Sequence, residues 1–145
     1  CFPLVLLRIS LASVDGDAIR KIYNKKLGHT LKDRETNALR ISRLAKYISD
    51  QNVNVIVSVL SNFPKWLKWN RKNIKNYFEV YLKTKMEILK KRKSKIYSKK
   101  VKNVIGVDLK FNEPKKSDLI IENSDNKNEI KINEINVLKK VRLII

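Results

Sequence analysis

Short runs of β-branched, apolar residues alternate with amphipathic helical segments along this chain. The clearest strand-like run is Val53–Leu60, whose nearly continuous apolar character predicts a strand buried on both faces of a sheet. Thr30 and Asp33 have the spacing of a capping box, which predicts a helix that begins there and ends near Asp50. Its apolar residues recur at the spacing of one buried helix face, at Ile41, Leu44, Ala45 and Ile48. Strands that alternate with helices indicate an α/β fold with a largely parallel sheet.

The remaining elements follow from the same kinds of pattern. The first strand is expected within either Pro3–Ile9 or Leu11–Val14, before the sequence Asp15-Gly16-Asp17. Further strands are predicted at Phe78–Leu82 and Leu119–Ile121, and helices at Ala18–Lys26, Phe63–Ile74, Met86–Arg92 and Asn126–Ile145. Residues 93–117 are basic and poorly periodic, so we expect a long mobile loop there. At this length we expect residues 1–145 to form a single domain.

The rare residue types and the apolar runs exclude several classes of protein. Cys1 is the only cysteine and His29 the only histidine, which excludes an internal disulfide framework, a Cys/His zinc site and catalysis by paired histidines. No stretch reaches the about 18–20 apolar residues that span a bilayer. The segment before Val14 is interrupted by Arg8 and lacks the basic start of a signal peptide, so we expect a cytoplasmic protein that makes no membrane contact. Because the chain begins with Cys, we expect it to be the later part of a longer reading frame.

The chain is strongly basic, with 33 Lys and Arg residues against 14 Asp and Glu residues and a formal net charge of +19. One interpretation is a surface of solvated lysines, and the other is a patch that binds nucleic acid or another polyanion. Only one run is dense, and it comprises Lys90, Lys91, Arg92, Lys93, Lys95, Lys99, Lys100 and Lys102. Near this run only Tyr97 and Phe111 offer a base a stacking surface, which disfavours nucleic acid as the partner.

Polar residues follow two of the predicted strands at their carboxyl ends, where ligands bind in open parallel sheets. Asp15 and Asp17 come after the first strand, and Ser61 follows the central one. An Asp-Gly-Asp sequence at a strand end is suited to hold Mg²⁺ or to act as a base toward a hydroxyl. The alternative is an ordinary Asp-Gly turn without a chemical role.

Two arginines are placed to bind an anion near these aspartates. Arg20 lies three residues after Asp17, about one helical turn, so both side chains reach the same crevice. Arg34 and Asn37 share a face in the first turns of the next helix, where backbone N–H groups favour an anion. Together, Arg20 and Arg34 are expected to hold a phosphate or sulfate through bidentate contacts. The alternative for each arginine is a solvated surface position.

These residues belong to an ordered set of motifs that resembles the adenylyl-sulfate kinase (APS kinase) family of P-loop phosphotransferases. Asp15–Arg20 resembles the family's Asp-Gly-Asp-x-x-Arg motif, and Leu27-Gly28 with Asp33–Asn37 resembles its Leu-Gly-Phe and Asp-Arg-x-x-Asn stretches. Leu60-Ser61 is similar to the start of the family's Ile-Ser-Pro. Further matches follow in order at Glu79–Tyr81, Arg92, Lys95, Tyr97, Asn103–Asp108, Glu113-Pro114 and Asp118-Leu119. The resemblance covers about residues 15–121 and keeps nearly the family's spacing.

The resemblance implies a three-layer, P-loop-kinase-like parallel sheet with flanking helices, in which the first strand and the P-loop are missing or replaced. It implies transfer of the γ-phosphate of ATP to the ribose 3′-hydroxyl of adenylyl sulfate, with ATP and Mg²⁺ as cofactors. The chain is then an N-terminally incomplete APS-kinase-like domain that serves sulfate activation, with residues 93–117 as a lid. The oligomeric state stays open, with a homodimer as one alternative.

The site residues that the resemblance implies divide by role. Asp15, Asp17 and Ser61 are the implied catalytic residues, with Asp15 facing Mg²⁺ through water and Asp17 orienting the acceptor hydroxyl. The implied ligands of the phosphosulfate end are Arg20, Arg34 and Asn37, and the nucleotide pocket is lined by His29, Leu60 and Ser61. Lys95 approaches the phosphates from the lid, and Arg92 lies near the adenine of ATP.

The chain departs from the family pattern at several positions. None of its 145 residues form a Gly-x-x-x-x-Gly-Lys-Ser/Thr loop, which normally cradles the phosphates of ATP. His29 stands where the family has a phenylalanine that stacks on the acceptor base, and an imidazole covers less area. Asn62 replaces a proline, and Lys93 replaces an aspartate. We therefore expect no turnover from these residues alone. A non-catalytic nucleotide-binding descendant and a nucleic-acid-binding module are the alternatives.

Overall fold

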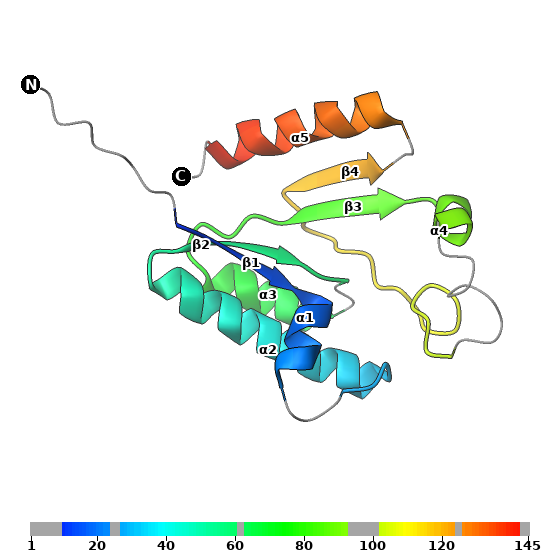
Figure 1. Cartoon of the computed structure of the whole chain (residues 1–145), viewed down its shortest axis with the longest axis horizontal. Coiled ribbons are helices and arrows are strands. Elements are labelled where there is room, and N and C mark those ends of the chain that lie inside the picture. The colour runs from blue at the N-terminus through cyan, green and yellow to red at the C-terminus, as the bar shows by residue number, and fades with distance from the viewer. Residues whose placement is uncertain (1–9, 24–26, 61–62, 93–101, 124–125, 143–145) are drawn as a thin grey trace, which may run out of the picture. The chain divides into compact units, whose positions relative to one another are not determined.

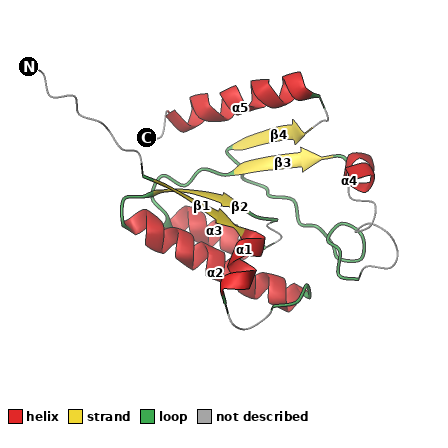
Figure 2. Cartoon of the chain, viewed as in Figure 1, coloured by secondary structure: helices red, strands yellow, loops and turns green. Residues whose placement is uncertain are grey.

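The computed structural model describes residues 10–23, 27–60, 63–92, 102–123 and 126–142, and the chain divides into two compact units (Figure 1). Unit 1 is Cys1–Lys75 and unit 2 is Asn76–Ile145. Each unit contains a pair of parallel strands accompanied by helices, as Figure 2 shows. The parallel pairing confirms the predicted α/β class. In the described part of the chain, no helix has the length and hydropathy that crossing a membrane requires.

Unit 1 is built on strands β1 (Leu11–Asp15) and β2 (Asn54–Ser58), which pair in parallel. Its described helices are α1 (Gly16–Ile22), α2 (Leu31–Asp50) and α3 (Pro64–Asn73). The buried core is formed by Val14, Ile19 and Ile41, and Leu44, Ile48 and Val55 pack against it. The predicted apolar face of the long helix is therefore confirmed, because it packs on the sheet.

The prediction that the run Val53–Leu60 forms a strand buried on both faces was wrong, because the described residues of unit 1 cover β2 on one face only. Val55 packs against the core, whereas Ile56 on the opposite face is 53% exposed. The strand also ends at Ser58 instead of the predicted Leu60. Helix α2 packs on the Val55 face, and none of the described residues of unit 1 buries Ile56. An apolar run predicts a strand, but it does not show how many faces of that strand other segments cover.

Helix α1 begins and ends earlier than predicted. Asp15 is its N-cap, so the helix begins at Gly16, because the carboxylate satisfies N–H groups of the first turn. It ends at Ile22, before the predicted stop at Gly28, and residues 24–26 lie outside the described residues. Of the two alternatives for the first strand, Leu11–Val14 is confirmed, and Pro3–Ile9 lies outside the described residues.

Unit 2 pairs β3 (Val80–Thr84) with β4 (Leu119–Asn123), and α5 (Lys127–Arg142) lies beside β4. Helix α4 (Met86–Arg92) follows β3 with the predicted bounds. Strand β3 begins two residues later than predicted because Asp118 engages Glu79 just before it. The Glu79 N–H donates to the Asp118 carboxylate (2.8 Å), and the Glu79 carbonyl accepts the Asp118 N–H (2.9 Å).

The segment that leads to β4 contains a folded turn in the described part of the predicted loop. The Asp108 carboxylate accepts the backbone N–H groups of Asn103 and Val104, and Val104 and Ile105 are buried. Gly106 has a φ of +86°, a conformation that side chains disfavour. Asp108 therefore organises the turn by satisfying two main-chain donors. Residues 93–101 lie outside the described residues.

Candidate active site

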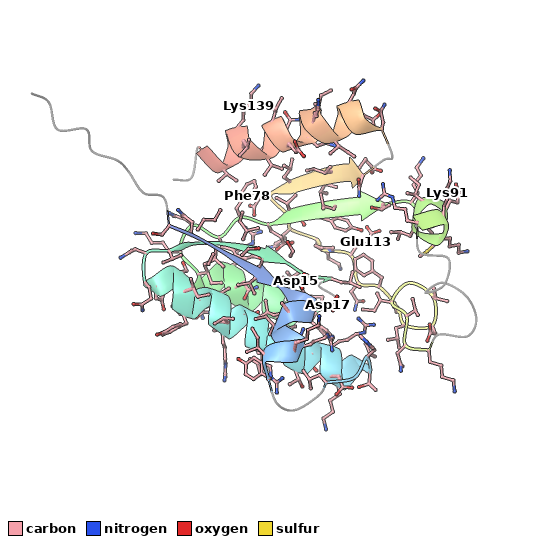
Figure 3. All side chains as sticks on the ribbon, in the orientation of Figure 1. Asp15, Asp17, Phe78, Lys91, Glu113 and Lys139 are labelled. Atoms are coloured by element: carbon pink, nitrogen blue, oxygen red, sulfur yellow. The ribbon has the colours of Figure 1, made fainter. Side chains whose placement is uncertain are left out.

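The two aspartates predicted at the end of the first strand lie at the carboxyl end of β1, where α1 begins (Figure 3). The Oδ1 atom of Asp15 accepts the backbone N–H groups of Asp17 (3.0 Å) and Ala18 (2.9 Å), which fixes the orientation of the Asp15 carboxylate. The Asp17 side chain is 87% exposed. One carboxylate is thus held by the backbone, and the other is available to a ligand from solvent.

Gly16, between these aspartates, allows the chain to turn against the core. A Cβ atom at this position would lie 3.3 Å from Cγ2 of Val59, which is tighter than an ordinary contact. The buried Asn37 side chain donates from Nδ2 to the Gly16 carbonyl at 3.0 Å. Asn37 therefore ties α2 to the turn that carries Asp15 and Asp17. Its Oδ1 atom is buried and has no hydrogen-bond partner among the described residues.

Replacing Asn37 with Ala is expected to lower the free energy of unfolding by about 1–3 kcal/mol, because the buried Gly16 carbonyl would lose its donor. Denaturant unfolding measures this loss directly. The matched control is Arg43→Ala on the exposed side of α2, which should change stability by less than about 0.5 kcal/mol. Equal stabilities of the two variants would contradict a structural role for the Asn37–Gly16 hydrogen bond.

The two predicted anion-binding arginines both contact the loop between α1 and α2. Arg20 donates from Nη1 to the Gly28 carbonyl at 2.7 Å, and its Nε lies 3.9 Å from Oδ1 of Asp17. Arg34 donates from Nε to the His29 carbonyl at 3.0 Å. His29 itself is exposed. The structure therefore brings Asp17, Arg20, His29 and Arg34 into one region of unit 1.

The start of α2 has the predicted cap. The Asp33 N–H donates to Oγ1 of Thr30 (3.2 Å), and the Thr30 hydroxyl donates to Oδ2 of Asp33 (2.6 Å). The hydrogen bond from the Thr30 hydroxyl lowers the pKa of the Asp33 carboxyl from its ordinary value of 3.8, although partial desolvation opposes the shift. A hydrogen bond from the Thr30 backbone and the positive charge of Arg20 lower this pKa further.

The lowered pKa of Asp33 predicts a pH-dependent contribution to stability. A carboxyl whose pKa is lower in the folded state stabilises the fold above its unfolded pKa, and this contribution is lost as the pH falls through the folded pKa. The melting temperature of the unsubstituted protein should therefore exceed that of Asp33→Asn above about pH 5, and the gap should shrink toward about pH 3. Thermal melts between these pH values test this.

The other predicted site residues divide between the two units and the residues that the structure does not describe. Leu60 follows β2 in unit 1 and is 59% exposed. Arg92 is the last residue of α4 in unit 2. Ser61 and Lys95 lie outside the described residues, and half of the dense basic run lies there too. Sequence reasoning missed the contacts of Gly16 and Gly28, although a glycine beside charged motif residues was the available signal.

Residues 3–122 match the family model described as adenylylsulphate kinase. The chain belongs to this family. It is 36% identical over 142 residues to cytidine diphosphoramidate kinase of Campylobacter jejuni, with 92% of this chain and 80% of that protein covered. It is 31% identical over 138 residues to adenylyl-sulfate kinase of Clostridium acetobutylicum, with 90% of this chain and 69% of that protein covered.

A solved structure shares this fold. The APS kinase CysC of Mycobacterium tuberculosis, in complex with AMPPNP and APS, matches with a TM-score of 0.75 and 27% sequence identity. The match covers 91% of this chain and 81% of the solved one. The predicted membership of the adenylylsulphate kinase family and the kinase-like α/β fold are thereby confirmed.

Kinases of the adenylylsulphate kinase family take ATP. The described residues are better suited to contact the metal ion that accompanies ATP than to bind the ATP phosphates. Mg²⁺ keeps several waters and is held by one or two carboxylates together with phosphate oxygens. Asp15 offers one oriented carboxylate, which fits a contact through water. Among the described residues, no cluster of three His, Cys, Asp or Glu side chains could hold a metal by itself. The 145 residues contain no phosphate-cradling glycine loop.

Proposed function

We propose that this protein serves phosphoryl transfer from ATP to a ribose hydroxyl of a nucleotide that carries a sulfate or amide on its terminal phosphate. The observation that supports this most directly is the exposed Asp17 carboxylate beside Arg20, with Arg34 bound to the same loop. A carboxylate orients a hydroxyl, and planar guanidinium groups donate paired hydrogen bonds to the oxygens of phosphate or sulfate. Positioning and charge neutralisation carry most of the catalysis in phosphoryl transfer.

Each side chain then has a defined role at the acceptor. Asp17 accepts the hydrogen bond of the ribose hydroxyl, and Arg20 and Arg34 neutralise the modified phosphate end. Asn37 is buried and holds the Gly16 carbonyl, so it orients the aspartate turn through the backbone. Mg²⁺, when bound with ATP, supplies charge neutralisation at the transferred phosphate.

Adenylyl sulfate is the first candidate acceptor, and its phosphorylation gives 3′-phosphoadenylyl sulfate. The family as a whole and the APS-bound solved structure support it. Cytidine diphosphoramidate is the second candidate. It is supported by the 36% identity to the Campylobacter jejuni kinase, which extends over 92% of this chain. His29 also favours the second acceptor, because its ring covers less area than phenylalanine and cytosine is a single-ring base.

Direct binding measurements separate these acceptors. We expect cytidine diphosphoramidate to bind more tightly than adenylyl sulfate, and both to bind more tightly than CMP or AMP, because the modified phosphate end adds contacts to the arginines. Isothermal titration of the four nucleotides tests this order. The reverse order of the first two would assign the protein to adenylyl sulfate and sulfate activation. Binding of neither acceptor would overturn the proposal. Displacement of the bound acceptor by an oligonucleotide at physiological salt would also overturn it, and would indicate that the basic run is a nucleic-acid site.

A further inference from the structure

The loop of residues 27–30 is fixed by side chains from both helices that flank it. Two successive carbonyls, of Gly28 and His29, each accept a hydrogen bond from a different arginine. Arg20 reaches the loop from α1 at 2.7 Å, and Arg34 reaches it from α2 at 3.0 Å. Hydrogen bonds from charged donors are about twice as strong as neutral ones. The backbone on both sides of the His29 Cα is therefore held by these arginines.

The opposite side of the 27–30 loop is packed against the cap of α2. A Cβ atom on Gly28 would lie 2.9 Å from Oδ2 of Asp33, which is too close for carbon and oxygen. The Thr30 hydroxyl donates to the same oxygen at 2.6 Å, so a shift of the Asp33 carboxylate would disturb this hydrogen bond. The loop is thus confined between the arginines and this carboxylate.

A guanidinium carries five N–H donors in one plane. Donation to a loop carbonyl therefore still allows the same arginine to bind an anion with other donors of its planar group. An anion bound by Arg20 and Arg34 would orient the guanidinium groups that hold Gly28 and His29. Binding at the phosphate end and the placement of the His29 ring are in this way connected through two hydrogen bonds.

We infer that Arg20 and Arg34 are positioning residues for His29 in addition to binding the anionic end of the acceptor, so that recognition of the base depends on them. This inference rests on the proposed function, because it takes the 27–30 loop to face the acceptor nucleotide. If Arg20 and Arg34 only bound the anion, they would contribute nothing to the binding of an uncharged nucleoside. If the two arginines also position His29, they contribute to nucleoside binding as well.

The test uses cytidine and adenosine, which have the base and ribose but no phosphate. His29 is the only histidine, so its imidazole NMR signals report binding at this loop without ambiguity. Arg20→Gln and Arg34→Gln are each expected to weaken nucleoside binding by about five- to tenfold, the effect of losing one ordered hydrogen bond. The matched control, Arg43→Gln on the exposed side of α2, should change it by less than about twofold.

Gly28→Ala provides a second variant that keeps both arginines. Its Cβ atom would lie 2.9 Å from Oδ2 of Asp33, so the loop or this carboxylate must shift, and a shift of the loop should weaken nucleoside binding in the same direction. Thermal melts establish that each variant is folded before titration. Nucleoside affinities unchanged by all three substitutions, with CMP or AMP binding lowered only by the arginine changes, would overturn the inference and leave the proposed function intact. Failure of the unsubstituted protein to bind any nucleoside or nucleotide would overturn both.

Discussion

A polypeptide of these 145 residues should transfer no phosphate from ATP to adenylyl sulfate or cytidine diphosphoramidate above the rate measured without protein. The glycine loop and lysine that cradle the β- and γ-phosphates in P-loop kinases occur nowhere among these residues. The roles proposed for the side chains at β1, α1 and α2 concern the acceptor, and none of these side chains replaces that cradle. A coupled assay for ADP, with protein purified free of host kinases, measures the rate.

Supplying the missing phosphate cradle should restore transfer if the acceptor side is intact. We expect a chimera, with the glycine-loop segment of a family member placed before β1, to phosphorylate one of the two acceptors. In that chimera, Asp17→Asn should lower kcat by about 10²–10⁴-fold, the usual effect of removing a group that handles the reacting proton. Lys139→Ala on α5 is the matched control and should leave the rate unchanged. Turnover by the 145 residues alone would contradict the expectation.

Local features of the sequence predicted local structure well. The cap formed by Thr30 and Asp33 and the buried positions Ile41 and Ala45 depend on residues three to seven apart, so the sequence pattern contains them. The start of β3 could not be predicted in the same way, because Glu79 is engaged by Asp118, a residue 39 positions later. The exposure of β2 likewise depends on which other segments cover the sheet.

In the candidate site, too, contacts between residues distant in the sequence could not be predicted. The motif residues Asp15, Asp17, Arg20 and Arg34 were predicted as a cluster, and unit 1 does contain them in one region. Their partners were not predictable from spacing. The Asn37–Gly16 contact joins residues 21 apart, and the arginines contact main-chain carbonyls that no side-chain pattern reveals. Backbone groups carry no sequence signal, so hydrogen bonds to them become known only from the fold.

Arg20→Ala and Arg34→Ala are each expected to weaken binding of the modified nucleotide by about 1.5–3 kcal/mol, the range for hydrogen bonds to charged groups. Both side chains are tied to the 27–30 loop, so little side-chain entropy is lost when an anion binds between them. Lys139→Ala should change the affinity by less than about 0.5 kcal/mol, because Lys139 is an exposed lysine of α5 that is not one of the candidate site residues (Figure 3). Isothermal titration of all three variants supplies the comparison.

This comparison distinguishes a built anion site from general attraction by a chain of net charge +19. General attraction is screened over about 10 Å at 0.1 M salt, and any exposed cation contributes to it in a similar way. Equal losses for all three variants would therefore mean that there is no specific site. A double variant adds a second criterion, because residues that share one ligand give non-additive changes. If Arg20 and Arg34 bind the same anion, the combined substitution should cost less than the sum of the two single ones, since the first loss already weakens the anion contact that the second would remove.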